Sequence, residues 1–506
     1  MKNRILVFIM LFSLTATAQF GTLDGDFDAD GIKEIVLADW SRAYDVAVQP
    51  DGKIVVCGTT STGSDLAFYL SRLQPDGSFD LGFGQSGTYV VDLTQSLDYL
   101  YAVEILADGK ILAAGTSGNQ VAVVKSLADG SYDATFGSNG NAILFPGHSP
   151  AEMRDLKVLP DGKILVSGLV WEGSDYNFAL MRLNADGSAD VSFSFDGVVT
   201  TNISDSDAAF AMQVHDNGKI TLAGNDGDSR AVLVQYNADG TLNNAFGTGG
   251  KVTLYPGGNL ASFEGLAIDS NGKLVAVGYA TDGVNPDDLL VARINEDGSL
   301  DNTFSTDGYA ITNLLGVASD ELVDVVIQED GKILACGNSY NFQQEIALAR
   351  YNPDGTLDNS FGTGGAVTTS LSNWAEAYSI ALQADGKAVV CGTKGDPPNS
   401  IVARYITGTN IGIGEVDAYI GSTLVYPNPI SENSVTVEYE LKSDETVSIE
   451  LYDLAGKQIT TLQASTKEKV GSYQKTLSLP TLSAGNYLLK LNTAKGAVSV
   501  QLTVSE

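Results

Sequence analysis

Histidine, cysteine and long apolar segments are all scarce in this chain of 506 residues. Its two histidines, His148 and His215, lack the spacing of a paired ligand set, so a histidine-based metal site is not expected. Three cysteines provide no disulfide framework, and Cys57, Cys336 and Cys391 are instead expected to be small buried core residues. Beyond the N-terminus no apolar run is long enough to span a bilayer, so no transmembrane segment is expected.

Basic residues are also few, with 29 Lys and Arg against 62 Asp and Glu, and the formal net charge is −33 at pH 7. Such a negative field disfavours nucleic acid and anionic lipid headgroups as partners. The sequence also lacks a serine nucleophile elbow, a phosphate-binding loop or a dinucleotide fingerprint in a strand-helix context. No catalytic residue is therefore predicted.

The N-terminus has the pattern of a secretory signal peptide over residues 1–18. Lys2 and Arg4 precede an apolar run at residues 5–14, and residues 16–18 (Ala-Thr-Ala) have the small side chains of a cleavage site. Cleavage is expected between Ala18 and Gln19, which predicts an exported, soluble protein.

A hairpin sequence, Asp-Gly or Asn-Gly followed by Lys, occurs seven times at intervals of 53 to 59 residues. Such pairs tolerate positive φ and suit a tight type I′ turn. In the unit around residue 271, alternating apolar residues before and after the turn and two further short segments indicate four antiparallel strands. A fixed period of this size with four strands per unit is typical of a propeller blade. The turns begin at Asp51, Asp108, Asp161, Asn217, Asn271, Asp330 and Asp385.

A second loop, Gly-x-x-Asp-x-x-Phe, follows six of the seven hairpins, with Asn once in place of Asp. The missing copy lies at the N-terminus, where residues 21–27 repeat the spacing of residues 355–361. We therefore expect a strand at about residues 32–38 to pair as the outer strand of the last blade, which would close a ring and remove exposed edges. The predicted fold is all-β, a seven-bladed β-propeller over residues 19–406 closed by an N-terminal outer strand.

Two repeated motifs indicate a family. They are the hairpin Pro-Asp-Gly-Lys at residues 50–53 and 160–163, and the loop Asp-Gly-Thr-Leu-Asp-Asn-Ser-Phe-Gly at residues 354–362. They resemble the delta-60 repeat family of bacterial propeller proteins. The resemblance covers about residues 20–406 and implies the propeller fold, but the family has no uniform activity to imply.

From about residue 425 the repeat gives way to alternating strands and short turns. They predict a small Ig-like β-sandwich over residues 425–506, after a linker at residues 407–424. Three motifs in order resemble the type A sorting domain of the type IX secretion system of the Bacteroidetes. This resemblance implies export to the cell surface or beyond, with the secretion machinery as a partner; the alternative is an Ig-like adhesion module. The motif residues are Tyr426, Pro427, Asn428 and Pro429, then Gly456, then Gly485 and Tyr487.

One acidic cluster departs from the repeat, with Asp26, Asp28 and Asp30 alternating before Gly31 and Glu34. This spacing matches the oxygen ligands of a short calcium loop, in which the glycine permits a sharp bend. A structural calcium ion at the closing blade is one interpretation. The other is a repeat loop that carries extra acids.

Polar residues also interrupt the apolar pattern of the innermost strands. Propellers commonly bind ligands at the mouth of the axial channel, so Asp45, Glu104, Asp155 and Asp324 are candidate ligand-binding residues there. The alternative is that they are polar residues at blade interfaces, which we favour because the sequence shows no accompanying aromatic cluster.

The sequence thus predicts a secreted or cell-surface, non-enzymatic propeller for binding or display, with a glycan or a protein as ligand and no cofactor beyond a possible structural calcium. The alternative is an extracellular propeller enzyme, a glycosidase or lyase, with carboxylates converging from different blades. The near-uniform length of the repeats argues against such a site, because an active site usually brings a long insertion.

Overall fold

A computed structural model describes residues 20–63, 65–93, 97–144, 149–256, 260–281, 287–314, 319–371, 374–408, 420–426, 430, 434–453, 458–483, 485–493 and 497–504. The chain divides into two compact units, residues 1–408 and residues 409–506. Among the described residues we find no helix with the length and apolar character needed to cross a membrane.

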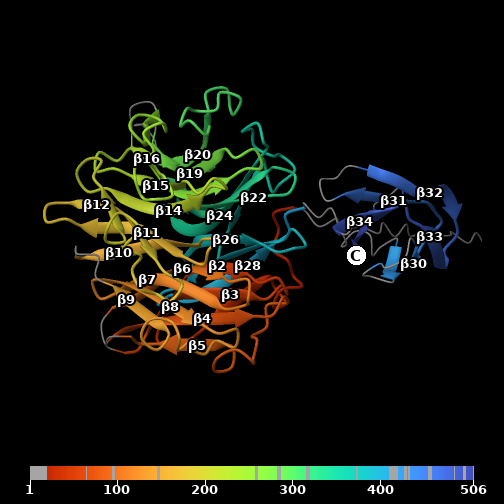
Figure 1. The fold of residues 1–506 in the computed structure, drawn as a ribbon, viewed down its shortest axis with the longest axis horizontal. Coiled ribbons are helices and arrows are strands. Elements are labelled where there is room, and N and C mark those ends of the chain that lie inside the picture. The colour runs from red at the N-terminus through yellow and green to blue at the C-terminus, as the bar shows by residue number, and fades with distance from the viewer. Residues whose placement is uncertain are drawn as a thin grey trace, which may run out of the picture. The chain divides into compact units, whose positions relative to one another are not determined.

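The first unit consists of four-stranded antiparallel sheets, seven of them in the described residues (Figure 1). The first three are β2 (Ser41–Val48), β3 (Ile54–Ser61), β4 (Leu66–Leu73) and β5 (Thr88–Val91); β6 (Asp98–Ile105), β7 (Ile111–Ser117), β8 (Gln120–Ser126) and β9 (Asn141–Leu144); and β10 (Ala151–Val158), β11 (Ile164–Trp171), β12 (Tyr176–Leu183) and β13 (Val198–Thr201). The next three are β14 (Ala208–Val214), β15 (Ile220–Asn225), β16 (Ala231–Tyr236) and β17 (Lys251–Leu254); β18 (Ala261–Ile268), β19 (Leu274–Ala280), β20 (Asp288–Ile294) and β21 (Tyr309–Thr312); and β22 (Ser319–Ile327), β23 (Ile333–Asn341), β24 (Gln343–Tyr351) and β25 (Ala366–Thr369). The last contains β26 (Ala375–Leu382), β27 (Ala388–Lys394), β28 (Asn399–Tyr405) and β1 (Ile32–Ile35).

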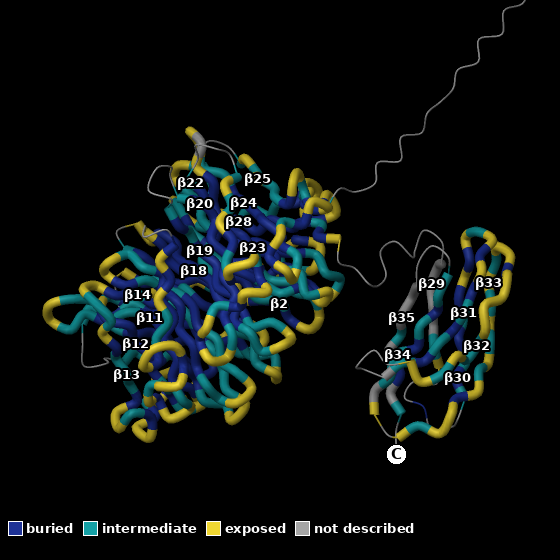
Figure 2. The backbone as a smooth tube through the Cα atoms, turned by 90° about the horizontal axis from the view of Figure 1, so that it is seen from above, coloured by how far each residue is buried: buried dark blue, intermediate teal, exposed yellow. Residues whose placement is uncertain are grey.

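The outer strand of this last sheet comes from the N-terminus, as predicted. β1 runs antiparallel to β28, with Ile32 opposite Ala403 and Ile35 opposite Ser400. The first strand of each sheet contacts the first strand of the next, from β2 through β6, β10, β14, β18 and β22 to β26, and β26 contacts β2. Strand interiors are buried, whereas the hairpins and loops are exposed (Figure 2).

The hairpins that join the first two strands of each sheet differ from the type I′ turn expected. In the turn at Asn271, the Gly272 amide donates to the Asp269 carbonyl, and the Asp269 amide donates to the Lys273 carbonyl. Only the glycine has positive φ, 78°. This is a type I turn with a glycine bulge, a longer loop than the two-residue form. In the other six hairpins the Asn or Asp before the glycine accepts the amide of the following lysine, as Asp51 does from Lys53. In the Asn271 turn the Lys273 amide donates to Asp269 instead.

The acid of the second repeated loop links three elements of the fold. In five sheets its carboxylate pairs with an arginine of the third strand and with the hairpin lysine, which gives the repeated acids and lysines a structural role. The arginine pairs are Asp80–Arg72 (2.8 Å), Asp190–Arg182 (2.7 Å), Asp301–Arg293 (2.6 Å), Asp358–Arg350 (2.8 Å) and Asp24–Arg404 (2.7 Å). The matching lysines are Lys53, Lys163, Lys273, Lys332 and Lys387.

The same arginines connect one sheet to the next. Arg72 donates through Nη1 to the Ala128 carbonyl at 2.5 Å, and its guanidinium lies 4.5 Å from the ring centre of the repeated Phe83. Arg404 makes the equivalent bond to the Pro75 carbonyl, which joins the last sheet to the first. The N-terminal loop behaves like other copies, because Phe27 packs against Gly77 of the next sheet as Phe83 packs against Gly130.

Cys57, Cys336 and Cys391 are buried free thiols, as the sequence predicts. Burial raises the pKa of each thiol well above its usual value, which keeps them protonated.

The second unit contains two sheets in its described part, with its own buried core. One is formed by β29 (Ile420–Tyr426), β30 (Ser434–Leu441) and β33 (Gly471–Ser478), the other by β32 (Gln458–Glu468), β31 (Glu445–Asp453), β34 (Gly485–Asn492) and β35 (Ala497–Val504). β29 begins at residue 420, inside the predicted linker of residues 407–424, because Ile420 pairs with Leu441 of β30.

Candidate functional site

Every first strand of the seven sheets has one break in its pairing with the second strand, a β-bulge. A glycine of the second strand lies next to each break, and a Cβ atom on Gly58, for example, would come within 1.9 Å of the Arg42 carbonyl oxygen. A bulge inserts one extra residue and re-aims its side chain. The residues at the break are Tyr44, Tyr101, Arg154, Phe210, Glu264, Val323 and Tyr378.

All seven bulge residues line one cavity of about 280 Å³, to which every first strand contributes. The cavity therefore lies where the seven first strands converge. Three of the four predicted channel residues, Asp45, Asp155 and Asp324, belong to its wall, each directly after or beside a bulge residue. Glu104 is not part of this wall.

The four predicted carboxylates bind backbone amides of the neighbouring sheet. Asp45 accepts from Val103 at 2.7 Å, and Glu104 accepts from Val158 at 2.8 Å. Asp155 and Asp324 do the same, with Met212 at 2.7 Å and Ile380 at 2.9 Å. The carboxylates thus connect adjacent first strands, as the interface interpretation of the sequence expects, and three of them also face the cavity.

Opposite charges meet inside the cavity wall. The Ser379 hydroxyl donates to Asp45 at 2.6 Å and to Asp324 at 2.9 Å, and so joins carboxylates from two different sheets. Lys157 lies 3.4 Å from Asp155, and the nearby carboxylates raise the pKa of Lys157. Burial raises the pKa of Asp45 to about 7, and the negative charge of Asp324 adds to the rise. Burial also raises the pKa of Glu264 to about 7.

The raised pKa of Asp45 predicts a pH dependence of stability that an Asp45→Asn variant removes. The folded protein keeps a proton that the unfolded chain, with an ordinary pKa of 3.8, releases. This stabilising contribution is complete below about pH 4 and is lost as the pH rises through about 7. We expect Asp45→Asn to gain stability relative to the unsubstituted protein over that range, measured by urea unfolding at several pH values. A pH-independent difference between the two proteins would contradict the assignment.

Aromatic side chains accompany these charges, contrary to the sequence interpretation. The Tyr44 ring centre lies 5.0 Å from that of Tyr101 and 5.2 Å from that of Tyr378, and Tyr99 stacks on Tyr101 at 5.7 Å. The Arg154 guanidinium lies 4.4 Å from the Tyr101 ring centre. Its Nε atom is buried without a hydrogen-bond partner. The rings come from strands far apart in sequence, so they escape a local search.

A local signal for these residues nevertheless exists. In a regular strand, core residues alternate with outward-facing residues, so one outward residue is expected between two core residues. Between the core residues Ala43 and Val46, however, there are two residues, Tyr44 and Asp45. Such a doubled position beside a glycine of the next strand indicates a bulge.

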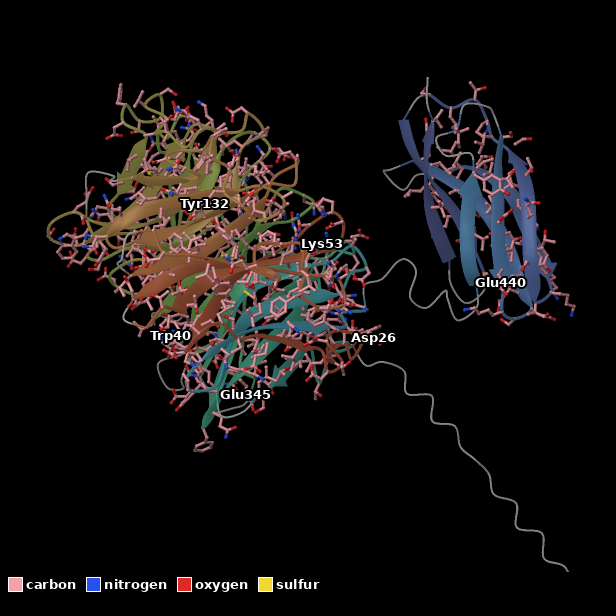
Figure 3. All side chains as sticks on the ribbon, turned by 90° about the horizontal axis from the view of Figure 1, so that it is seen from below. Asp26, Trp40, Lys53, Tyr132, Glu345 and Glu440 are labelled. Carbon is pink, nitrogen blue, oxygen red and sulfur yellow. The ribbon has the colours of Figure 1, made fainter. Side chains whose placement is uncertain are left out.

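A second polar-aromatic group adjoins the rings at the ends where the first strands begin. Arg42 lies 5.6 Å from the Trp374 ring centre, and the Trp374 indole N–H donates to Gln344 at 2.7 Å. Gln344 donates in turn to Glu376 at 2.9 Å, and the Tyr378 hydroxyl also donates to Glu376. In Figure 3, Trp40 and Glu345 mark this side of the first unit, away from Lys53 and Asp26.

The predicted calcium loop does not bring its four carboxylates together. Asp28 pairs with Lys33 at 3.2 Å, Glu34 pairs with Lys394 at 3.0 Å, and Asp30 accepts the Ile32 amide. Among the described residues, which include Asp26 and the other three acids, no group of three or more acidic, His or Cys side chains is arranged to hold a metal ion. The lysines take the charge-balancing role expected of an ion, and the cluster matches the alternative of a repeat loop with extra acids.

Several predicted residues of the export signals lie outside the described residues, namely Ala18, Gln19, Pro427, Asn428, Pro429 and Gly456. His148 does as well. Tyr426 ends β29 and donates its hydroxyl to Glu438, and Tyr487 in β34 donates to the Ser483 carbonyl at 2.9 Å. Gly485 begins β34.

Comparison with known proteins gives two family matches. Residues 49–83, 106–136, 159–193, 215–246, 270–304 and 328–361 match the family described as "Domain of unknown function (DUF5122) beta-propeller". Residues 424–505 match the family described as "Secretion system C-terminal sorting domain". No curated protein matches the chain.

Two solved structures are similar to the chain at low levels. Sqt1 from Chaetomium thermophilum has a TM-score of 0.39 and 10% identity, over 97% of this chain and 100% of that chain. The polysaccharide lyase Uly1 has a TM-score of 0.36 and 10% identity, over 75% of this chain and 90% of that chain. Neither likeness bears on function at these values.

The two families confirm the predicted propeller repeat and sorting domain. The six matched segments run from each hairpin to the Phe of the following loop, the part of the repeat that forms the interlocking arginine contacts. A sorting domain of this kind indicates export to the cell surface or the extracellular space. The chain is therefore built from propeller repeats of the DUF5122 family followed by a C-terminal sorting domain of the type IX secretion system.

Proposed function

We propose that this protein is an exported, non-enzymatic propeller that binds a carbohydrate at the cavity where its first strands converge. The observation that carries the proposal is the group of three neighbouring tyrosines, Tyr44, Tyr101 and Tyr378, in a wall that also holds Arg154 and Glu264. Flat rings next to hydrogen-bonding charges suit a ligand with apolar ring faces and many hydroxyl groups, which is the chemistry of a sugar.

The site requires the seven sheets to form a closed ring, and we propose that they are the blades of one. The contact between β26 and β2, the pairing of β1 with β28, and the Arg404 bond to Pro75 of the first sheet support closure. A ring of this kind holds all seven bulges at fixed positions. The closed propeller therefore preorganises the aromatic side chains and the charged groups of the cavity, which lowers the entropic cost of binding.

A Tyr101→Ala variant tests the site. Tyr101 contacts Tyr44, Tyr99 and the Arg154 guanidinium, so its loss removes the centre of the aromatic group. We expect affinity to fall at least tenfold, which corresponds to about 1.4 kcal/mol of binding free energy. Truncation of a central aromatic anchor typically costs more than this. The measurement is titration calorimetry with whichever oligosaccharide stabilises the full chain in a thermal-shift panel.

Phe195→Ala is the control for this variant, because Phe195 is 98% exposed in the loop after β12, at the opposite strand ends. It should leave affinity unchanged. A sugar present at a hundred times its dissociation constant should raise the free energy of unfolding by about 2.7 kcal/mol. If no sugar in the panel shifts the melting temperature, a protein ligand or a display role is favoured.

An enzyme acting on polysaccharide is the second candidate, and one observation favours it. Asp45 and Glu264 line the same cavity, and burial raises the pKa of each to about 7, a value suited to general acid-base catalysis near neutral pH. The hydrogen bonds of Asp45 to Ser379 and Val103 occupy its carboxylate in a structural role, so binding is preferred. Release of reducing ends or unsaturated products from a bound polysaccharide would reverse this preference.

A further inference from the structure

The cavity connects to an aromatic and polar path whose residues lie in or next to four successive sheets, those of β6, β2, β26 and β23–β24. We call this path the aromatic strip, and define it as Tyr101, Tyr44, Arg42, Trp374, Gln344 and Tyr340. The first two residues belong to the cavity wall, and the last two lie on β24 and β23 of another sheet.

Each step of the strip rests on a contact. Tyr101 and Tyr44 have ring centres 5.0 Å apart, and the Tyr44 ring centre lies 5.2 Å from that of Tyr378. The Tyr378 hydroxyl donates to Glu376, which also accepts from Gln344 at 2.9 Å. Arg42 lies 5.6 Å from the Trp374 ring centre. Gln344 accepts the Trp374 indole N–H, and Tyr340 stands directly opposite Gln344 in the β23–β24 pairing. Directly opposed residues share one face of a sheet, so the strip is continuous.

Trp374 is held firmly although it is only half-buried. A backbone bridge to Gln344, the indole hydrogen bond to the same residue and the Arg42 contact hold it from two strands, β24 and β2. A tryptophan fixed in this way and still open to solvent is a ready platform for an apolar ring face.

The aromatic strip ends at the long β23–β24 hairpin, whose tip has exposed aromatic side chains. β23 and β24 are nine residues long, whereas the second and third strands of the other sheets have at most eight. At its tip Tyr340 is 56% exposed and Phe342 is 93% exposed. Phe342 also has a φ of 65°, a left-handed conformation that is costly for a bulky residue and often marks a functional position.

Building on the proposed function, we propose that the ligand is an uncharged glycan chain whose end enters the cavity and whose following sugars lie along the aromatic strip to the β23–β24 hairpin. A cavity of about 280 Å³ is at the small end for ligand sites, so it holds only the end of a chain. The strip supplies successive ring faces for further sugars. The net charge of −33 disfavours polyanionic glycans, because the protein field repels them.

Chain length and one variant series test this proposal in the full-length protein. The probes are cello-, xylo- and manno-oligosaccharides from disaccharide to hexasaccharide, with oligogalacturonates as the charged comparison, and affinity is measured by calorimetry. We expect the hexasaccharide of one series to bind at least tenfold more tightly than its disaccharide. Trp374→Ala and Tyr340→Ala should abolish this gain and leave disaccharide affinity unchanged.

Matched controls separate the strip from general effects of losing an aromatic residue. Trp171→Ala removes another half-buried tryptophan, at the end of β11 on the same side of the unit, and should keep the full length dependence. Because Trp374→Ala removes a packed ring, thermal melting checks its fold. The exposed Tyr340 provides the variant least able to disturb folding.

The outcomes distinguish the two proposals. If affinity does not depend on the length of the oligosaccharide, the proposal that sugars bind along the aromatic strip is wrong, while binding in the cavity stands. The same holds if the higher affinity of the hexasaccharide persists in both Trp374→Ala and Tyr340→Ala. Tighter binding of oligogalacturonates overturns the uncharged ligand. No binding by any oligosaccharide overturns the strip and the proposed function together.

Discussion

Deletion of residues 20–35 should lower the free energy of unfolding of the N-terminal unit by at least about 6 kcal/mol, the sum of one lost buried phenylalanine and one broken buried ion pair. The segment supplies Phe27 and Ile35, both fully buried, and the carboxylate of Asp24. It also supplies β1, whose loss leaves β28 as an unpaired edge. Total stabilities of 5 to 15 kcal/mol are typical, so a large share of the stability would be lost.

Chemical denaturation and sedimentation of the deleted protein measure this effect, and self-association through the bare β28 edge is the expected second sign. A chain that lacks residues 409–506 is the control, because it removes a larger but separate unit. It should unfold at the same denaturant concentration as the N-terminal unit of the full chain. An unchanged midpoint after deletion of residues 20–35 would disprove the closing role of this segment.

Asp24→Ala should cost about 3 to 5 kcal/mol by itself, the usual effect of removing one partner of a buried ion pair. Asp24 is 4% exposed and accepts from Arg404 at 2.7 Å and from Lys387 at 2.8 Å. Its loss leaves the Arg404 guanidinium, buried between the last and first sheets, without its carboxylate. Asp26→Ala is a matched control, since Asp26 lies two residues away and is exposed, and it should change stability by less than about 0.5 kcal/mol.

The effect of Asp24→Ala should also depend on pH. Burial alone would raise the pKa of Asp24, but the Lys387 hydrogen bond and the Arg404 charge outweigh burial and hold the pKa below 3.8. A lowered folded-state pKa stabilises the protein above the unfolded value and loses this contribution as the pH falls. The difference in stability between the variant and the unsubstituted protein should therefore begin to shrink as the pH falls below about 4. Equal losses at pH 3 and pH 7 would instead indicate a packing defect.

Repetition is what makes most of this fold predictable from sequence. The hairpin glycines and the loop acids mark turns at fixed intervals, and the copy at residues 21–27 indicates that the N-terminus completes the last sheet. The turn type could not be predicted in the same way. Asp-Gly and Asn-Gly suit both a type I′ turn and a type I turn with a glycine bulge, and only the backbone angles distinguish them.

The site was less accessible to prediction because it assembles from residues about 55 positions apart. Asp45, Asp155 and Asp324 stand out locally as polar residues in apolar strands, but Tyr44 and Tyr378 become neighbours only across the first and last sheets. For the acids at residues 26–34 the sequence leaves two interpretations open. Their spacing resembles a metal loop, while Lys33 and Lys394, the residues that neutralise them, are visible only in the structure.

The pairing of β1 with β28 also sets an order of events during synthesis. Ile32 and Ala403 are partners although 371 positions separate them (403 minus 32), so this contact forms among the last and after a large loss of chain entropy. During synthesis β1 therefore has no partner until β28, which ends at residue 405, has been made. The sorting domain follows directly, so the N-terminal unit becomes able to complete its fold just before the C-terminal export signal has been made.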